Sequence, residues 1–262
     1  MNLRSLISAF FIFLSAALFC QPDSGINKSD SDGRKQGRWI KKYPHNSVMY
    51  KGFFRDNYPE GEFIRYYEDG TIRSVLNYSN KGSEADARIY HPNGYLSASG
   101  RYINQKKEGL WKFYSEFVSG YLVSEESYSG NLRNGTSVKL YPDSTIAEKL
   151  NYINDTASGE WNKYYSNGNV CLKSTLSKGK INGKFEAWFS DGVLQFSGEY
   201  RNDKREGTWL IYEKDGTLRY KLEYSGGVTK NREMDIDISD YLDSLEKNKG
   251  KIPDPEITGA PW

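Results

Sequence analysis

Hydrophobic and polar residues alternate along short stretches of this chain, which predicts β-strands with one apolar face. In the stretch LQFSGEY at 194–200, Leu, Phe and Tyr occupy even positions, whereas Gln, Ser and Glu occupy odd positions. The stretch LRYKLEY at 218–224 follows the same rule. Because successive side chains of a strand point to opposite faces, each stretch predicts a strand that buries one face and exposes the other.

A turn signal precedes each of these stretches. A shorter stretch rich in Trp, Phe and Tyr comes first, and an Asp-Gly or Asn-Gly pair follows it, which accepts the positive φ angles of a tight hairpin turn at low cost. The pairs are Asp69-Gly70, Asn93-Gly94, Asn167-Gly168, Asp191-Gly192 and Asp215-Gly216. Two strands joined by such a turn form a β-hairpin, so the sequence predicts a string of hairpins.

The hairpin pattern returns at a constant interval. A glycine opens the units, at Gly37, Gly61, Gly109, Gly135, Gly159, Gly183 and Gly207. Successive units are 24 residues apart, except that 26 residues separate Gly109 from Gly135, and Ala85 occupies one expected glycine position. A period of this length indicates a repeat architecture that grows unit by unit. We therefore expect an all-β fold, an elongated array of antiparallel β-hairpins over residues 37–228.

Composition supports strands and argues against a nucleic-acid partner. The chain of 262 residues has 21 Tyr, 12 Phe and 6 Trp, residue types that favour strands. Its 36 Lys and Arg are interspersed with 34 Asp and Glu, whereas a polyanion-binding protein carries a clustered basic excess. Of the two cysteines, Cys20 and Cys171, only the second lies in the repeats, so no disulfide framework holds the array together.

The first twenty residues have the pattern of an export signal. A short segment with one positive charge, Met1–Arg4, precedes the apolar stretch Leu6–Phe19, and polar residues follow. This order is typical of a secretory signal peptide, and the apolar stretch is short for a membrane span. We therefore expect residues 1–20 to be a signal peptide and the protein to be exported.

Two processing routes are compatible with this signal. The small residues at 15–17 suit ordinary signal peptidase. Alternatively, residues 17–20 (Ala-Leu-Phe-Cys) resemble a bacterial lipobox in which Cys20 is acylated, although Phe19 stands where Gly or Ala is usual. An acylated N-terminus would tether the array to a membrane without spanning it. Residues 21–36, rich in Ser, Asp, Lys and Gly, are expected to form a flexible linker.

The period ends after Gly227, and residues 229–262 form a different kind of segment. Apolar residues among acidic ones at 234–248 predict a short amphipathic helix over Ser239–Lys247, with Gly250 and Pro253 beyond its end. A terminal repeat exposes apolar surface unless it is covered, so we expect this helix to cap the last hairpin. Docking of a partner is the alternative role.

The sequence contains no convincing catalytic, metal or cofactor site. Both histidines, His45 and His91, lie beside a proline in predicted hairpin turns, two repeats apart, which does not favour a shared metal site. No glycine-rich loop opens a helix, as phosphate binding would require. We therefore expect no enzymatic activity and no cofactor. Four repeated tryptophans, at Trp39, Trp111, Trp161 and Trp209, are expected to pack the sheet, and the alternative is a stacking platform for sugars.

The repeated phrase Gly-x-Trp/Phe-x-x-Tyr/Phe-Tyr/Phe-x-Asp/Asn-Gly resembles the MORN repeat, and more closely its bacterial variant. The phrase is clear at 61–70, 159–168, 183–192 and 207–216, whereas Ala87 and Ser137 replace the first aromatic residue in two units. The resemblance covers about residues 34–228. It implies a β-hairpin array and a role in protein contacts, membrane association or scaffolding. Some members are labelled antitoxins of toxin–antitoxin pairs.

Three functions follow as hypotheses. The first is a non-catalytic scaffold at the bacterial cell envelope, periplasmic or membrane-anchored, at the outer membrane or surface, that binds another protein. The second is a carbohydrate-binding module that uses an aromatic face. The third is the antitoxin role, which conflicts with an export signal because antitoxins act in the cytoplasm.

Overall fold

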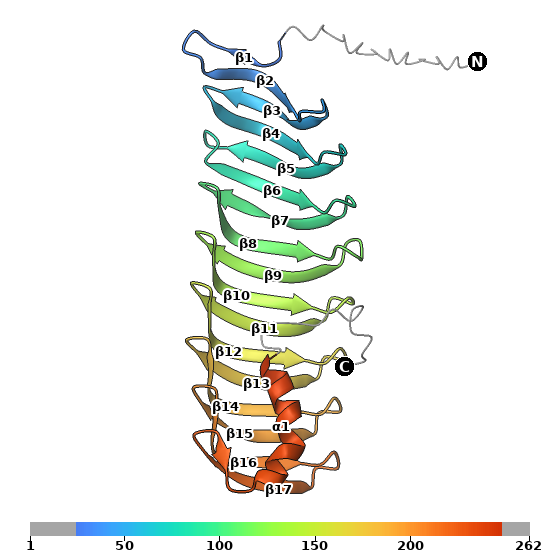
Figure 1. Ribbon diagram of the computed structural model, residues 1–262, viewed down its shortest axis with the longest axis vertical. Coiled ribbons are helices and arrows are strands. Elements are labelled where there is room, and N and C mark those ends of the chain that lie inside the picture. The colour runs from blue at the N-terminus through green and yellow to red at the C-terminus, as the bar shows by residue number, and fades with distance from the viewer. Residues whose placement is uncertain (1–24, 248–262) are drawn as a thin grey trace, which may run out of the picture.

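The computed structural model describes residues 25–247, so the predicted signal peptide, Cys20 and the end of the C-terminal tail lie outside the described residues. These residues form a single antiparallel sheet whose strands are stacked along the long axis of the molecule, and one helix (Figure 1). The predicted all-β array of hairpins is therefore confirmed. None of the described helices is long and apolar enough to cross a membrane.

Sixteen long strands form eight hairpins, and two short strands lie at the ends of the array. The strands are β1 (Lys28–Ser29), β2 (Lys35–Lys42), β3 (Val48–Arg55), β4 (Tyr58–Tyr66), β5 (Ile72–Ser79), β6 (Glu84–Tyr90), β7 (Leu96–Ile103), β8 (Lys106–Tyr114), β9 (Leu122–Ser129), β10 (Leu132–Leu140), β11 (Ile146–Ile153), β12 (Thr156–Tyr164), β13 (Val170–Ser177), β14 (Lys180–Trp188), β15 (Leu194–Arg201), β16 (Lys204–Tyr212), β17 (Leu218–Ser225) and β18 (Val228–Thr229). The helix is α1 (Arg232–Lys247).

Two kinds of turn connect the strands. After the first strand of five of the eight units, the backbone closes on an Asp-Gly or Asn-Gly turn, as where Tyr67 N donates to Thr71 O at 2.8 Å and Gly70 has a φ of 88°. Between units, two consecutive residues have positive φ, for example Asn104 at 49° and Gln105 at 62°. Such pairs form tight turns whose twist matches that of the flanking strands. The turn signals in the sequence thus fix the hairpins.

The glycine that opens most units marks a β-bulge. Gly109 has a φ of 69°, and the register between β7 and β8 shifts around it, from Ser99↔Lys112 to Arg101↔Glu108. A bulge of this kind bends the strand and increases its twist. Ala85 replaces this glycine in one unit, and there the pairing of β5 with β6 runs without a register shift. The repeated glycine therefore curves the sheet.

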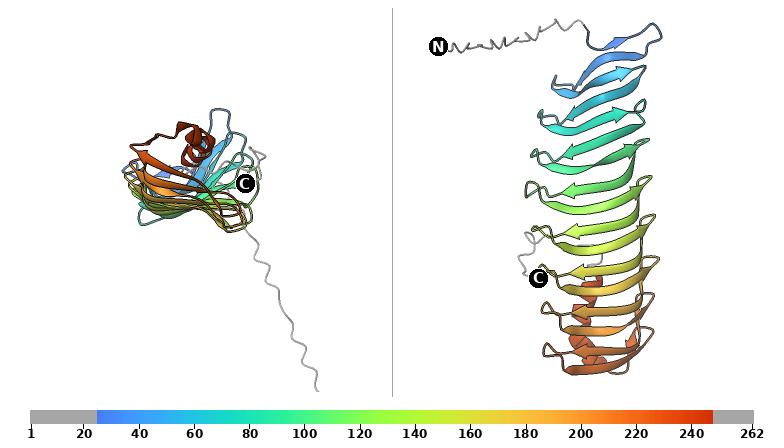
Figure 2. Two further views of the ribbon diagram at one scale, coloured as in Figure 1. Left: turned by 90° about the horizontal axis from the view of Figure 1, so that it is seen from below. Right: turned by 180° about the vertical axis from the view of Figure 1, so that it is seen from behind.

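The curved sheet forms a trough with a concave inner face, inside which α1 lies (Figure 2). In three units, the large aromatic side chain of the inner face lies directly against a glycine of the preceding strand. A Cβ at Gly198 would lie 2.3 Å from the Trp209 ring, and one at Gly100 would lie 2.4 Å from the Trp111 ring. Trp111 and Trp209 are fully buried. Glycine is therefore required at these two strand positions, because the ring lies directly against the backbone.

Tyrosines tie neighbouring hairpins together at one edge of the trough. Each donates its hydroxyl hydrogen to a backbone carbonyl 23 residues further along the chain, at 2.7 to 2.9 Å. The pairs are Tyr43 to Tyr66, Tyr67 to Tyr90, Tyr141 to Tyr164 and Tyr165 to Trp188. A buried tyrosine hydroxyl needs such a partner. The ladder explains why the sequence keeps a tyrosine at this position in four of the eight units.

The two ends of the array carry additional structure. Within the segment predicted as a linker, β1 pairs with the start of β2, and the Asp30 carboxylate accepts hydrogen bonds from the backbone N–H groups of Asp32 and Arg34. At the other end, the predicted helix is present but begins at Arg232, seven residues before Ser239. Acidic residues in its first turn favour this earlier start, because they interact well with the positive end of the helix dipole.

Helix α1 extends further along the sheet than the sequence predicts. It runs back along the inner face over several C-terminal hairpins, and not over the last hairpin alone (Figures 1 and 2). Leu242 is fully buried and belongs to the core cluster that includes Trp209 and Leu222. The helix therefore completes the core of the C-terminal half of the array.

Candidate functional site

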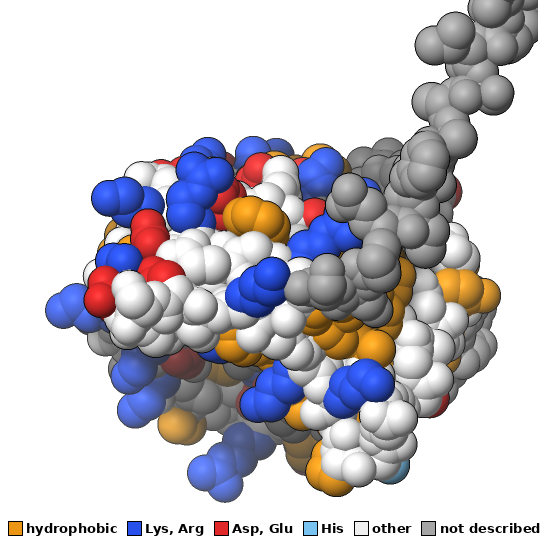
Figure 3. Space-filling view, turned by 90° about the horizontal axis from the view of Figure 1, so that it is seen from above, with side chains coloured by type: hydrophobic (Ala, Val, Ile, Leu, Met, Phe, Trp, Pro, Cys, Tyr) orange, Lys and Arg blue, Asp and Glu red, His pale blue; other side chains and the backbone are white. Residues whose placement is uncertain are grey.

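The inner face is divided into a covered half and an open half. Helix α1 covers the C-terminal hairpins, whereas a groove of about 780 Å³ lies open on the N-terminal hairpins. We call it the open groove, and it is lined by Tyr58, Pro59, Arg65, Arg73, Ser74, Leu76, Tyr78, Lys81, Gly82, Ser83, Glu84, Ala85, Ile89, Tyr102, Asn104 and Gln105. Viewed from the N-terminal end, Figure 3 shows hydrophobic side chains gathered in the hollow of the molecule, with Lys and Arg side chains beside them.

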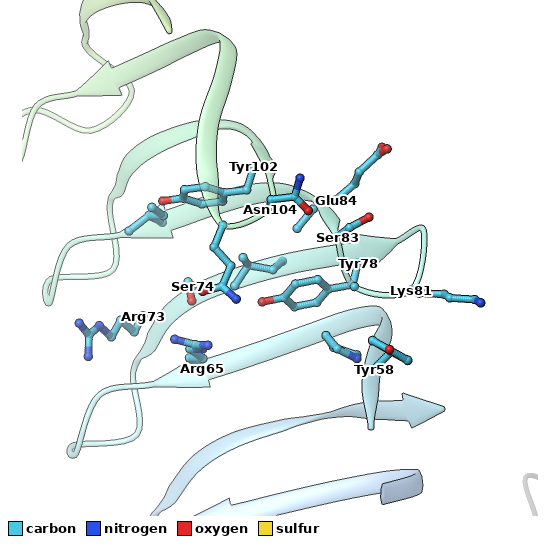
Figure 4. A pocket seen from close by; sticks show the side chains of 16 residues that line it. Tyr58, Arg65, Arg73, Ser74, Tyr78, Lys81, Ser83, Glu84, Tyr102 and Asn104 are labelled. Carbon is cyan, nitrogen blue, oxygen red and sulfur yellow. The ribbon is translucent and has the colours of Figure 1, made fainter. Parts of the chain in front are cut away.

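Strands β4 to β7 and the turns after them supply the walls of the open groove. Figure 4 shows the rings of Tyr78 and Tyr102, from neighbouring hairpins, extending in the same direction across the groove, with Arg65 and Arg73 toward one end. The Arg65 guanidinium lies 5.8 Å from the ring centre of Phe63 and has no ion-pair partner among the described residues. The groove thus combines a half-buried aromatic floor with exposed positive charge.

Charge in the open groove is predominantly positive. It holds three basic side chains, Arg65, Arg73 and Lys81, and one acidic side chain, Glu84. Glu84 forms an ion pair with Arg101, and hydrogen bonds from Arg101 and Asn80 lower its pKa. Because its carboxylate is already neutralised, Glu84 does little to offset the positive charge in the groove.

In the covered half, a buried arginine connects the sheet to α1. The Arg205 guanidinium lies 3.1 Å from the carboxylates of both Asp235 and Asp243, and it donates to Ser239 Oγ at 3.3 Å. Arg205 is only 8% exposed. The Tyr224 hydroxyl donates to the same Asp235 carboxylate, and burial together with this bond raises the pKa of Tyr224 to about 12. Acidic residues of α1 therefore neutralise a buried cation of the inner face.

Basic residues recur at the repeat position of Arg205. Arg205 lies two residues before the opening glycine of its unit, and Lys35, Lys107 and Arg133 lie two residues before Gly37, Gly109 and Gly135. Each of these side chains lies over aromatic rings, as where Lys107 Nζ is 5.0 Å from the Trp111 ring centre and 4.7 Å from that of Tyr128. Such contacts stabilise a cation on an aromatic surface.

The cations at this position in the open half differ from Arg205 because no carboxylate within residues 25–247 forms an ion pair with them. Among the described residues, neither Lys35 nor Lys107 has an ion-pair partner. Burial lowers the pKa of the Lys107 ammonium, and attraction to Glu126 offsets only part of this effect. Lys107 pairs directly with Tyr102 across β7 and β8, so it borders the open groove. This half of the inner face therefore presents charge that lacks a carboxylate of the kind α1 supplies.

The tryptophans singled out in the sequence are packing residues in this arrangement. Trp111, Trp161 and Trp209 are fully buried, and Trp39 is half-buried. The indole N–H of Trp111 donates to Arg101 O at 3.1 Å and that of Trp161 to Glu148 at 2.8 Å. A ring without exposed surface cannot stack on a sugar, so these three residues give no support to the carbohydrate-binding alternative.

A charged cluster that sequence reasoning missed separates the two halves of the inner face. Ser137 replaces the usual aromatic residue, and the Glu148 carboxylate, 1% exposed, lies 3.9 Å from Lys139 Nζ and 4.0 Å from Lys163 Nζ. The sequence contains a signal for this cluster, because Glu126 and Glu148 occupy inward positions where other units have small or apolar residues. Glu148 thus forms a buried cluster with these two lysines and the Trp161 indole, and this cluster stabilises the fold.

The remaining polar candidates do not assemble a catalytic site. His45 stacks on Tyr43 in one turn, and His91 lies near Tyr114 O in another. Burial raises the pKa of the Cys171 thiol, which disfavours the reactive thiolate form. No cluster of three His, Cys, Asp or Glu that could hold a metal ion occurs within residues 25–247.

Comparisons with known proteins identify the repeats. The profile of the MORN repeat variant matches residues 59–80 and 205–225, which confirms the resemblance. No curated protein matches the chain. Solved structures with some likeness include "Crystal Structure of TarM", at 11% identity and a TM-score of 0.29 over 37% of this chain and 19% of that one. Another is "Crystal Structure of TcdB2-TccC3-Cdc42", at 12% identity and a TM-score of 0.22 over 71% of this chain and 13% of that one. This chain thus spans less than a fifth of either protein.

Proposed function

Because the chain is built from MORN-variant repeats, we propose that it is an exported, non-catalytic scaffold that binds another protein at the bacterial cell envelope. The open groove is the observation that carries this proposal. It offers aromatic and basic side chains together on one face of the sheet. Aromatic residues and arginine are the residue types enriched where proteins bind one another.

The covered half supports the same proposal. There, α1 covers the equivalent part of the inner face, and the largest core cluster lies beneath the helix. In the open half the described core cluster is small, and it consists of Ala87, Ala98 and Trp111 with partly buried neighbours. We take this half-exposed apolar trough as the surface that a partner covers in the complex.

Export and membrane attachment rest on the first twenty residues. The charged start and the apolar stretch favour a secretory signal, and Cys20 would carry a lipid if the lipobox-like residues are used. An array tethered at its N-terminus would hold the open groove, which lies in the N-terminal half, close to the membrane. The antitoxin role requires a cytoplasmic protein and is the less favoured reading.

Photo-crosslinking in the source bacterium tests the scaffold function. A photoreactive phenylalanine analogue at Tyr102 would report contacts of the open groove, and the same analogue at Arg88, an exposed residue on the outer face, is the matched control. We expect crosslinks to one identifiable envelope protein from position 102 and not from position 88. Equal crosslinking from both positions, or none from either in envelope fractions, would contradict the proposal.

A further inference from the structure

Helix α1 shows what kind of segment the inner face accepts. Its sequence, REMDIDISDYLDSLEK, carries six acidic and two basic residues. It buries Leu242 against the aromatic floor and presents Asp235 and Asp243 to Arg205. A single acidic, amphipathic helix is therefore a ligand that this surface already binds within its own chain.

We propose that the open groove binds one acidic amphipathic helix of a partner protein, in the way that the covered half binds α1. This inference rests on the proposed scaffold function and names the chemistry of its partner. A helix satisfies its own backbone hydrogen bonds, so it can lie in an apolar trough without pairing to a strand edge.

The repeat supplies the geometric argument. Lys107 and Arg205 occupy the same position of the unit, four units apart. Each unit contributes two strands about 4.8 Å apart, so the two cations are separated by roughly 38 Å along the array. Helix α1 has 16 residues and is therefore about 24 Å long. A second helix over the N-terminal hairpins would fit beside α1 without overlap.

Charge complementarity decides what kind of helix fits. Arg65 in the groove wall and Lys107 at its border lack ion-pair partners among the described residues, and the one acidic residue of the groove already pairs with Arg101. Carboxylates on the flank of an apolar stripe would neutralise these cations, as Asp235 and Asp243 neutralise Arg205. The floor of Leu76, Tyr78 and Tyr102 would receive the apolar stripe.

Fluorescence anisotropy with a defined probe tests this inference. The probe is a labelled synthetic peptide with the sequence of residues 232–247, and the control peptide has its four aspartates replaced by asparagine. The protein is the purified full-length chain. We expect saturable binding that weakens with added salt, and no binding of the control peptide, because the carboxylates supply the attraction.

Matched charge variants locate the site. The double variant Arg65→Gln/Lys107→Gln should weaken probe binding by about tenfold, which corresponds to about 1.4 kcal/mol. The variant Arg38→Gln/Arg88→Gln removes the same charge from exposed outer-face positions and should leave binding within about twofold of the parent. Thermal melting of each variant establishes that the array still folds.

Several outcomes would overturn the inference. These are no binding of the probe, equal loss in both double variants, or loss confined to Arg205→Gln, which would mean that the probe merely replaces α1 at its own site. A concentration-dependent dimer that is lost in Arg65→Gln/Lys107→Gln would assign the groove to a second copy instead. If position 102 crosslinks to an envelope protein but the probe does not bind, the scaffold function stands and the acidic-helix ligand is wrong.

Discussion

Replacing Gly198 by alanine tests the idea that inner-face aromatic rings rest directly on the backbone of the preceding strand. The added Cβ would lie 2.3 Å from two atoms of the Trp209 ring, a distance that no real contact allows. The ring has little room to move, because Phe185, Tyr200 and Tyr224 surround it with ring centres 5.1 to 6.0 Å away. Gly198→Ala must therefore displace a fully buried side chain.

The expected loss of stability follows from two opposing effects. Overpacking of a filled core costs about 1–3 kcal/mol. Replacing glycine by alanine within a strand recovers about 0.5–1 kcal/mol, because glycine loses more conformational entropy on folding. We therefore expect the free energy of unfolding to fall by about 1–2 kcal/mol, measured by urea denaturation with tryptophan fluorescence as the signal.

A double-mutant cycle provides the control. In the equivalent place of another unit, Ser174 lies opposite Phe185, so a phenylalanine ring can be placed to accommodate a Cβ. The ring of Phe63 is not placed in this way, because a Cβ at Gly52 would lie 2.1 Å from it. Gly198→Ala/Trp209→Phe should therefore lose less stability than the sum of the two single variants, because they share one contact. Additive losses, or an unchanged denaturation midpoint for Gly198→Ala, would refute the close packing of ring on backbone.

Three further predictions concern the helix, the pH dependence and the N-terminus. Arg205→Ala should leave the carboxylates of α1 without their partner, lower stability by about 1–3 kcal/mol and expose the helix to limited proteolysis, whereas intact protection would contradict the anchoring role. The pKa of Tyr224 is raised from 10.0 to about 12, so the stability that its protonated hydroxyl contributes is complete below pH 10 and is lost as the pH rises toward 12. Urea denaturation across this range should show a decline in the free energy of unfolding, and Tyr224→Phe should reduce that decline. Intact mass of membrane-bound protein should show a chain that starts at an acylated Cys20, and an unmodified chain in the soluble fraction would exclude the lipid anchor.

The strands and turns were predictable because their determinants are local. Alternation within eight residues sets the inward face of a strand, and an Asn or Asp beside glycine sets the turn. The effect of Ala85 was harder to foresee, although its position was evident. Only the structure shows that the missing glycine removes a β-bulge, because a bulge is a property of two paired strands.

Contacts between residues far apart in sequence were not predictable from the repeat. The apolar spacing after Gly227 indicates that a helix forms, but it does not reveal which surface that helix covers. The anchoring pairs join Arg205 to residues 30 and 38 positions later, and nothing in the periodicity links them. The same holds for Glu148, whose charge is acceptable on the inner face only because Lys139 and Lys163 come from neighbouring strands.

The difference between the two halves of the inner face is therefore the most informative feature of the molecule. The repeats build similar troughs along the whole array, and a basic residue recurs at one position of the unit. In the covered half, α1 supplies carboxylates and an apolar side chain for that surface. In the open half the cation at the same position, Lys107, keeps its aromatic contacts but forms no direct ion pair among the described residues. The trough binds its own helix at the C-terminal end. At the N-terminal end, the same kind of aromatic and basic surface can bind a similar helix from another protein.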